Sequence, residues 1–261
     1  MKADPRFTGL FWAVWRRNLR VYRRILAINF LPPLLEPLFY LLAFGLGFSG
    51  LVTDVSWHGQ TMRFIQFFAS ALVAVTTMWQ AFMETTYNSF VRMFFQKSYD
   101  AMLATPLSLE EIIVAEIVWG ATRAVIAAAI MLCVIAVMGY VPSFEALAII
   151  PVAFLGGLAF GALGMAITSV TSSIDMFNLP LFLFITPMFL FSGTFFPVEA
   201  LPGWAADCAV MMPLYHLAEL TRAACLGRLT AASWGNAAVL AGCIVVFLPL
   251  ALAGMRRRLI R

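Results

Sequence analysis

Long apolar runs constrain this chain more than any other feature of its sequence. Six stretches of mostly apolar residues, each long enough to cross a bilayer as a helix of about 20 residues, are separated by short polar segments. Because 62% of the residues are hydrophobic and 11% are charged, the chain cannot cover a water-facing surface, and lipid is its expected solvent. We therefore predict an all-α integral membrane protein with six transmembrane helices. The spans are expected at approximately Leu26–Phe48, Arg63–Thr86, Leu109–Met138, Glu145–Val170, Met176–Phe196 and Asn236–Met255.

The basic residues predict the orientation of the chain. Seven of the 17 Lys and Arg residues precede the first span, and four more close the chain. Basic flanks of short segments stay in the cytoplasm, so both termini are predicted to be cytoplasmic, as an even number of spans requires. A basic patch can also bind nucleic acid, but here it adjoins apolar segments, which favours a membrane surface.

Residues 7–24 predict an amphipathic helix ahead of the first span. Apolar side chains recur at helical spacing from Phe7 to Val21, while Arg16, Arg20 and Arg24 form a separate stripe four residues apart. Such a helix lies in the membrane interface. It is either a simple anchor or a docking and gating element.

Two connections between the predicted spans are unusual. Residues 87–111 form the longest inward connection, and Ser108 and Glu111 make a capping box just before the third span. Residues 195–231, on the outer side, are apolar but interrupted by proline and glycine, which favours two short helices in a broken, re-entrant hairpin. The residues that mark this hairpin are Gly193, Pro197, Pro202, Pro213 and His216. His216 is expected to cap a helix and not to bind a ligand.

Four charged residues fall within the predicted spans or at their inner ends: Glu36, Glu84, Glu116 and Arg123. Charges at this depth are costly and are usually functional. For Glu84 and Glu116 we predict an ion-pair network that holds the helices in register. For Glu36 and Arg123 the network and a place on a transport path are equally favoured.

Aromatic residues concentrate in the first and fifth spans. The first span carries Phe39, Tyr40, Phe44 and Phe48, and the fifth carries Phe182, Phe184, Phe189, Phe191, Phe195 and Phe196. They are either ordinary packing and lipid-facing residues or the walls of a groove between the two spans. Aromatic faces bind sugar rings and acyl chains without needing charge.

Residue patterns for chemistry are missing from the sequence. It lacks the P-loop G-x-x-x-x-G-K-[ST], H-E-x-x-H and G-x-S-x-G, and its four cysteines do not have metal-ligand spacing. We therefore expect no catalytic residue, metal or cofactor in this chain. Cys208 and Cys225 fall near the outer face, but a disulfide between them is not expected.

Three segments together resemble the membrane subunit of a type-2 ABC exporter, and most of all the NodJ-type subgroup of polysaccharide and lipo-oligosaccharide export permeases. They are LLEPLFYLLAFGLGFSG (Leu34–Gly50), FVRMFFQKSYDAMLATPLSLEEIIVAEIVWGATRA (Phe90–Ala124) and FLFSGTFFPVEALPGWAADCAVMMPLYHLAELTRAACLG (Phe189–Gly227). The pattern S-G-T-F-F-P…L-P…P-L-x-H is specific to the superfamily. The resemblance covers nearly the whole chain, so residues 1–261 are expected to form a single transmembrane domain.

The resemblance implies a homodimer in the bacterial inner membrane, bound to two copies of a separate ATPase that carries the ATP and Mg²⁺. Residues 87–111 would hold the segment that couples to this ATPase, and residues 7–24 a gate helix. The first and fifth spans would line a path for an amphiphilic glycan or glycolipid through the membrane lipids. The expected coupling residues are Arg92, Lys97, Tyr99, Asp100 and Leu103. The expected pathway aromatics are Phe39, Tyr40, Phe44, Phe184, Phe191 and Phe195.

Other functions remain open at this point. The same superfamily also suits a drug, an antibiotic or another lipid as cargo. A lipid-modifying membrane enzyme would be active without ATP, and a channel or scaffold would form no stable complex with an ATPase.

Overall fold

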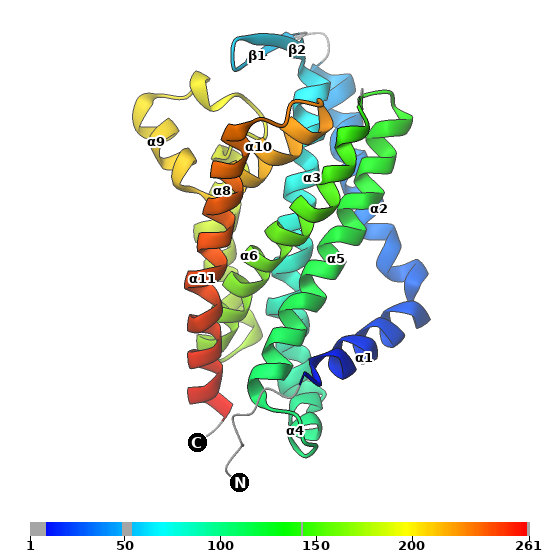
Figure 1. The fold of residues 1–261 in the computed structure, drawn as a ribbon, viewed down its shortest axis with the longest axis vertical. Helices are drawn as coiled ribbons and strands as arrows, with labels where there is room; N and C mark the ends of the chain where they lie inside the picture. Colours follow the sequence, from blue (N-terminus) through cyan, green and yellow to red (C-terminus); the bar gives the residue numbers. More distant parts are fainter. Residues whose placement is uncertain (1–8, 49–53, 142, 260–261) are drawn as a thin grey trace.

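The computed structural model describes residues 9–48, 54–141 and 143–259. The described part of the chain is a bundle of long helices that run along a common axis, with a β-hairpin at one end and α4 at the other (Figure 1). The start of α1 and the end of α11 lie at the α4 end (Figure 1). An even number of crossings places the two termini on one side in this way.

The apolar runs form the membrane-spanning helices predicted from them. Five helical segments are long and apolar enough to cross a bilayer: Phe64–Phe95, Leu109–Val137, Phe144–Val170, Ile174–Phe191 and Ala231–Leu259. A sixth arises when α1 and α2 are counted together, because Phe11–Arg24 and Asn29–Gly45 are joined by a bend of 78°. The predicted count of six spans is confirmed when this bent pair is included.

The elements are bounded as follows. The helices are α1 (Phe11–Arg24), α2 (Leu26–Phe48), α3 (Phe64–Met83), α4 (Ser98–Leu103), α5 (Leu109–Val137), α6 (Ile149–Val170), α7 (Asn178–Pro180), α8 (Thr186–Phe191), α9 (Gly203–Met211), α10 (Pro213–Cys225) and α11 (Ala231–Leu259). Short 3₁₀ turns cover Phe144–Ala148, Ile174–Phe177 and Val198–Ala200, and π-helical turns cover Glu84–Asn88, Val91–Phe95 and Leu181–Ile185. The strands are β1 (Asp54–Trp57) and β2 (Gln60–Arg63).

The second span is longer than the sequence predicts. It was expected to end near Thr86, but α3 continues through two π-helical turns to Phe95. The charges at Glu84 and Arg92 mark the end of a span in a hydropathy reading, whereas in the structure both are paired inside the bundle. The inward connection therefore begins at Gln96 and not at Tyr87.

The turn before α5 matches its prediction. The Ser108 hydroxyl accepts a hydrogen bond from the Glu111 amide at 3.2 Å, and the Ser108 amide donates to the Glu111 carboxylate at 3.0 Å. This reciprocal pair is the capping box predicted from the sequence.

A small antiparallel sheet is the exception to the all-helical prediction. Strands β1 and β2 lie between the first and second spans and pair with Asp54 opposite Arg63 and Trp57 opposite Gln60. The two-residue turn is His58–Gly59, and both residues have positive φ, 48° and 74°. Two left-handed residues match the twist of a tight hairpin. The strands are only 4 residues each, too short to show a clear alternating pattern.

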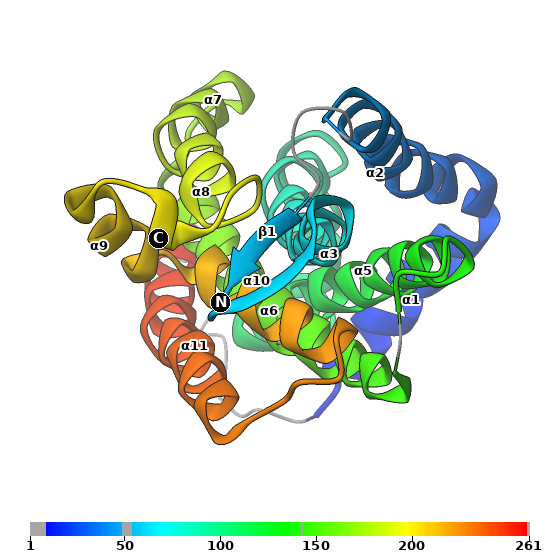
Figure 2. The same ribbon diagram turned by 90° about the horizontal axis from the view of Figure 1, so that it is seen from above.

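Small residues bring α5, α6 and the second span close together near the centre of the bundle, with α2 at its periphery (Figure 2). A Cβ added at Gly157 would lie 2.7 Å from the Ala121 Cα, and one at Gly164 would lie 3.2 Å from the Phe82 carbonyl oxygen. Gly157, Gly161 and Gly164 therefore let α6 approach α5 and the second span closely.

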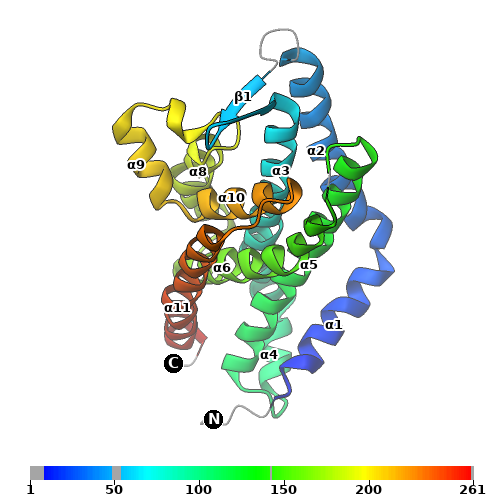
Figure 3. The same ribbon diagram turned by 45° about the horizontal axis from the view of Figure 1, so that its top comes forward.

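The region after the fifth span forms the two short helices expected there. Helix α10 lies across the top of the bundle, between α3 and α11, with α9 to one side (Figure 3). Pro202 and Pro213 stand at the starts of α9 and α10, where a missing N–H costs nothing. Almost every side chain of α10 from Leu214 to Cys225 is buried, so this segment is part of the core.

Candidate functional site

Four charged side chains meet inside the bundle near the end that carries α4, which we call its inner end. We call these residues the inner network: Glu84, Arg92, Glu116 and Arg123. Glu84 and Arg92 project from the π-helical end of the second span, and Glu116 and Arg123 project from α5. The Glu84 and Glu116 carboxylates are almost completely buried, at 1% and 0% exposure. Buried charges are tolerated only when they are paired.

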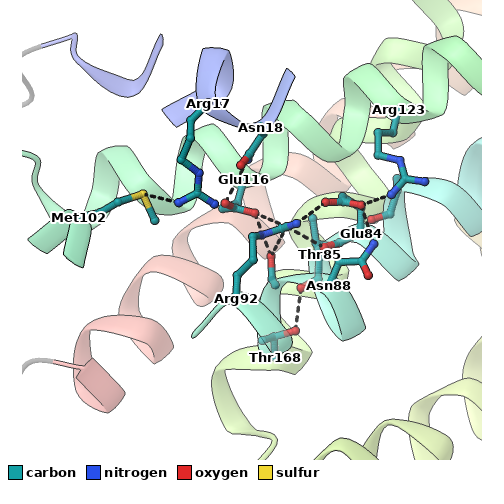
Figure 4. Close-up of polar contacts among 12 residues, drawn as sticks. Arg17, Asn18, Glu84, Thr85, Asn88, Arg92, Met102, Glu116, Arg123 and Thr168 are labelled. Carbon is teal, nitrogen blue, oxygen red and sulfur yellow. Dashed lines mark hydrogen bonds and ion pairs between the residues drawn. The ribbon is translucent and has the colours of Figure 1, made fainter. Parts of the chain in front are cut away.

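The inner network alternates acid and base (Figure 4). Arg92 bridges the two carboxylates, with its Nη1 at 2.7 Å from Glu84 Oε1 and its Nη2 paired with Glu116. Arg123 pairs with the other oxygen of Glu84. Asn88 donates to Glu84 at 2.7 Å, and Ser89 donates to Glu116 at 3.2 Å. The predicted network of Glu84 and Glu116 is therefore formed, and Arg123 belongs to it.

The π-helical turns of the second span explain how one helix holds so much of the inner network. Turns of this kind are rare and occur frequently at functional sites. They leave backbone groups without their usual intrahelical partners, and here the Thr168 hydroxyl of α6 donates to the Thr85 carbonyl at 2.8 Å. Three helices, the second span, α5 and α6, are thus joined at this level.

Helix α1 is docked against the inner end of the bundle. The Leu10 amide donates to the Glu111 carboxylate at 3.0 Å, and Trp15 Nε1 donates to the Thr122 hydroxyl at 3.0 Å. Asn18, which is buried, donates to Glu116 at 3.2 Å. Arg17 lies 3.4 Å from the Met102 sulfur of α4. These contacts fix α1 to α5 and α4 of its own chain.

The expected coupling residues lie in different environments. Arg92 was expected in an exposed connection, but it belongs to the buried inner network, because two carboxylates attract it there. Tyr99 is fully buried, and desolvation together with the Glu116 charge raises the pKa of its hydroxyl. Leu103 is partly buried, whereas Lys97 and Asp100 are exposed. Tyr99 therefore anchors α4 to the bundle, whereas Lys97 and Asp100 lie on the exposed side of this segment.

Aromatic residues of the first and fifth spans do meet, on the surface of α3. Phe44 has ring centroids 5.0 Å from Phe68 and 5.2 Å from Phe195, and Phe195 lies 5.0 Å from Phe189. Tyr40 contacts Phe189 at 6.2 Å. These five residues form the aromatic cluster. Phe68 was missed by the sequence reasoning, although its neighbours Phe64 and Phe67 mark an aromatic face of the second span.

The other three expected pathway aromatics are exposed. Phe39, Phe184 and Phe191 have exposed fractions of 61%, 57% and 40%. They therefore lie on outer surfaces of α2 and the fifth span. The side chain of Phe48 lies outside the described part of the chain.

A small cavity of about 70 Å³ opens beside the aromatic cluster, between α2, α3 and α8. Its walls include the Glu36 carboxylate, the Gln80 amide and the rings of Tyr40, Trp79 and Phe189. Glu36 is exposed and makes no ion pair among the described residues. Of the four intramembrane charges, it is the one that lines this cavity. Carboxylate, amide and aromatic groups together suit a ligand with hydroxyl groups and an apolar body.

A second charged group, at the opposite end of the bundle, was not assigned a role from sequence. Arg222 donates to Glu219 at 2.7 Å and to the Gly193 carbonyl at 2.7 Å. Glu219 also accepts from Trp57 Nε1 at 3.0 Å and lies 2.9 Å from His58 Nε2. These five residues form the outer clasp. It ties the β-hairpin and the end of the fifth span to α10.

Two features of the outer clasp fix its geometry. Gly193 has φ of 72°, a conformation that favours glycine, and this turn aims its carbonyl at Arg222. The Arg222 guanidinium stacks 3.8 Å from the centroid of the Phe67 ring. Burial lowers the pKa of Arg222, while the Glu219 charge acts in the opposite direction. The Glu-x-x-Arg spacing in an otherwise apolar helix is the sequence signal that points to this pair.

His216 joins three elements of the outer hairpin. Its Nε2 lies 2.9 Å from the Val210 carbonyl in the last turn of α9, and its Nδ1 lies 2.8 Å from the Asn236 side chain of α11. A carbonyl only accepts, so Nε2 carries a proton. His216 thus caps α9, in agreement with its predicted role.

Cys208 is exposed and Cys225 is buried, and neither forms a disulfide.

The membrane-spanning helices, with α4 at one end of the bundle and the broken hairpin at the other, are those of a multi-pass membrane protein. The sequence profile of the ABC-2 type transporter family matches residues 9–226. The chain therefore belongs to the ABC-2 type transporter family, and the resemblance identified from its sequence is confirmed.

The chain is also similar to individual proteins. The chain is 37% identical to "Nodulation protein J" of Rhizobium leguminosarum bv. viciae over 254 residues, which cover 97% of this chain and 96% of the relative. It is 34% identical to "Nodulation protein J" of Bradyrhizobium diazoefficiens, over 95% of this chain and 94% of the relative. A more distant relative, at 27% identity over 64% of this chain and 45% of the relative, is "Probable multidrug ABC transporter permease YbhR" of Escherichia coli.

Proposed function

We propose that this chain is the permease of an ATP-driven exporter that moves an amphiphilic glycan or glycolipid, such as a lipo-oligosaccharide, out across the bacterial inner membrane. The permease is a homodimer, and two copies of a separate ATPase supply the ATP and Mg²⁺. The observation that carries the cargo class is the cavity of Glu36, Tyr40, Trp79 and Gln80 beside the aromatic cluster. Its chemistry suits hydroxyl groups attached to an apolar body, and near-full-length relatives are named for nodulation.

The coupling to the ATPase is proposed to enter through α4. Lys97 and Asp100 offer exposed charges of both signs to a partner. The buried Tyr99 fixes α4 to the bundle, and Arg17 and Glu111 connect α4 and α5 to α1. A push on α4 is therefore transmitted to α1 and to the helices that share the inner network. The start of α1 and the end of α11 lie at the same end of the bundle as α4 (Figure 1), so the cytoplasmic termini proposed from the basic flanks would put α4 on the side of the ATPase.

Co-purification tests this proposal. The chain is co-expressed with candidate ATPases and purified in detergent, and ATP hydrolysis is measured with and without a lipo-oligosaccharide. A complex with equal copies of both subunits, stimulated by the glycolipid, is the expected result. A complex that is not stimulated overturns the cargo, and failure to bind any ATPase overturns the exporter assignment.

The second candidate is export of a drug, favoured by the similarity to the E. coli permease named as a probable multidrug transporter. The same assay discriminates the two, because a drug exporter is stimulated by cationic or neutral drugs and not by the glycolipid. A Glu36→Gln variant sharpens the result. Loss of glycolipid stimulation with unchanged basal ATP hydrolysis would support binding at the Glu36 cavity.

A further inference from the structure

A larger polar cavity lies beneath α1 and is separate from the aromatic cluster. It has a volume of about 220 Å³ and lies between α1, the start of α2, the end of the second span and α5. Three guanidiniums line it, from Arg17, Arg92 and Arg123, together with a single carboxylate, Glu84. Even with Glu116 behind Arg92, the cations outnumber the carboxylates. The cavity therefore carries excess positive charge within the membrane protein.

The guanidiniums at this cavity have donors to spare. Arg17 donates to a thioether, a weak acceptor, and makes no ion pair among the described residues. The Nε of Arg92 is buried and has no hydrogen-bond partner in the described part of the chain. Figure 4 shows Arg17 reaching from α1 toward the inner network. Arg17 and Arg123 each use one terminal nitrogen within the described residues, so an anion entering here would gain charge-assisted hydrogen bonds from their other donors.

The opposite rim of the cavity is apolar. Val21 and Ile25, at the corner between α1 and α2, line it and have exposed fractions of 54% and 45%. Exposed apolar side chains beside a membrane-spanning helix offer a contact surface for an acyl chain. A cavity with guanidiniums inside and an apolar rim at the membrane matches an amphiphile with an anionic head.

We propose that this cavity binds the phosphate-bearing headgroup of an anionic phospholipid. The phosphate pairs with Arg17 and with the unused donors of Arg123, beside the positive charge of Arg92, and an acyl chain leaves over Val21 and Ile25. The volume of about 220 Å³ holds a phosphate with a few waters, each of roughly 30 Å³. The bound lipid wedges α1 against the second span, so it sets how firmly α1 is docked. The site does not depend on the identity of the exported cargo.

Lipid binding to the purified full-length chain tests the proposal. Native mass spectrometry compares dioleoylphosphatidylglycerol with zwitterionic dioleoylphosphatidylcholine on the wild type, Arg17→Gln and the matched control Arg20→Gln, which removes an exposed charge from the same helix. We expect the wild type to prefer the anionic lipid, and Arg17→Gln to bind it about tenfold more weakly. Arg20→Gln should change the affinity less than about twofold, and Arg17→Lys should retain most of the binding because it keeps the charge.

Three outcomes would overturn the site. Equal losses in Arg17→Gln and Arg20→Gln would mean that only surface charge attracts the lipid, and equal affinity for the two lipids would mean that no anion site exists. An excess of inorganic phosphate that displaces the anionic lipid would show that free phosphate is the ligand, and the lipid assignment would be wrong. The thermal unfolding midpoint of each variant, measured without lipid, shows whether weaker binding reflects loss of the fold.

Discussion

The inner network and the outer clasp both bury charge, but they do so in opposite ways. The inner network holds two acids and two bases in alternation, with exposed fractions of 15% or less for all four side chains. The outer clasp gathers three donors on one carboxylate, Glu219, and one of them, His58, is 56% exposed. Water can replace the contacts of the exposed His58, whereas the inner network joins two long helices, the second span and α5. The inner network is therefore expected to hold the bundle together, and the outer clasp to hold one movable element, the β-hairpin.

The largest effect is expected from Glu84→Gln. This change removes the carboxylate shared by Arg92 and Arg123 and leaves two buried guanidiniums with one acid between them. Breaking a buried pair costs about 3–5 kcal/mol, because an uncompensated charge stays buried. Chemical unfolding in detergent, followed by tryptophan fluorescence, measures it. Glu145→Gln, at an exposed position, is the control, and equal stability of the two variants would contradict the paired network.

Glu219→Gln should have a smaller and more local effect. The side-chain amide oxygen introduced by this change would still accept from Trp57, but Arg222 would lose its counter-charge. We expect a loss of about 2 kcal/mol, and faster proteolysis near His58–Gly59 because the hairpin is released. A stability loss as large as that of Glu84→Gln, without faster cleavage of the hairpin, would remove the distinction between the two clusters.

Asn18→Ala probes the link between α1 and the inner network. The change removes one hydrogen bond to Glu116, and Glu116 keeps Arg92 and Ser89. The expected loss of stability is only about 1 kcal/mol. Hydrogen exchange of the α1 backbone should nevertheless accelerate, while exchange in α10 stays unchanged. Arg20→Ala, an exposed change on the same helix, should leave both helices protected.

The same comparison shows what the sequence could and could not predict. Periodicity and capping chemistry act over a few residues, so the spans, the Ser108 capping box and the small-residue face of α6 were predictable. Glu84 and Glu116 were predictable as members of an ion-pair network, because charges inside spans need counter-charges. The extension of the second span to Phe95 was not, because Arg92 looks like a span end until Glu116, 24 residues later, is placed beside it.

The contacts of the outer clasp were harder still to predict from the sequence. Trp57 and Glu219 are 162 residues apart, and no local pattern links a hairpin to a helix at that distance. Gly193 contributes through its carbonyl, which carries no side-chain signal at all. Phe68 was missed for a similar reason, since its role depends on Phe44 of α2 and on Phe195 in the turn after α8.

The smallest expected effect is on the labelling rate of Cys225, which lies at the end of α10 and reports on the outer clasp. Burial raises the pKa of its thiol to about 12, and the thiolate is the reactive form. Maleimide labelling of Cys225, followed by peptide mass spectrometry, should therefore stay slow when the pH rises from about 7 to about 9, whereas the exposed Cys208 labels readily. Glu219→Gln should speed labelling of Cys225 several-fold by loosening α10, and a mildly destabilising change at the inner network, Asn18→Ala, should not. If Asn18→Ala accelerated the labelling of Cys225 as much as Glu219→Gln does, the two ends of the bundle would open together. The outer clasp would then not control a separate element.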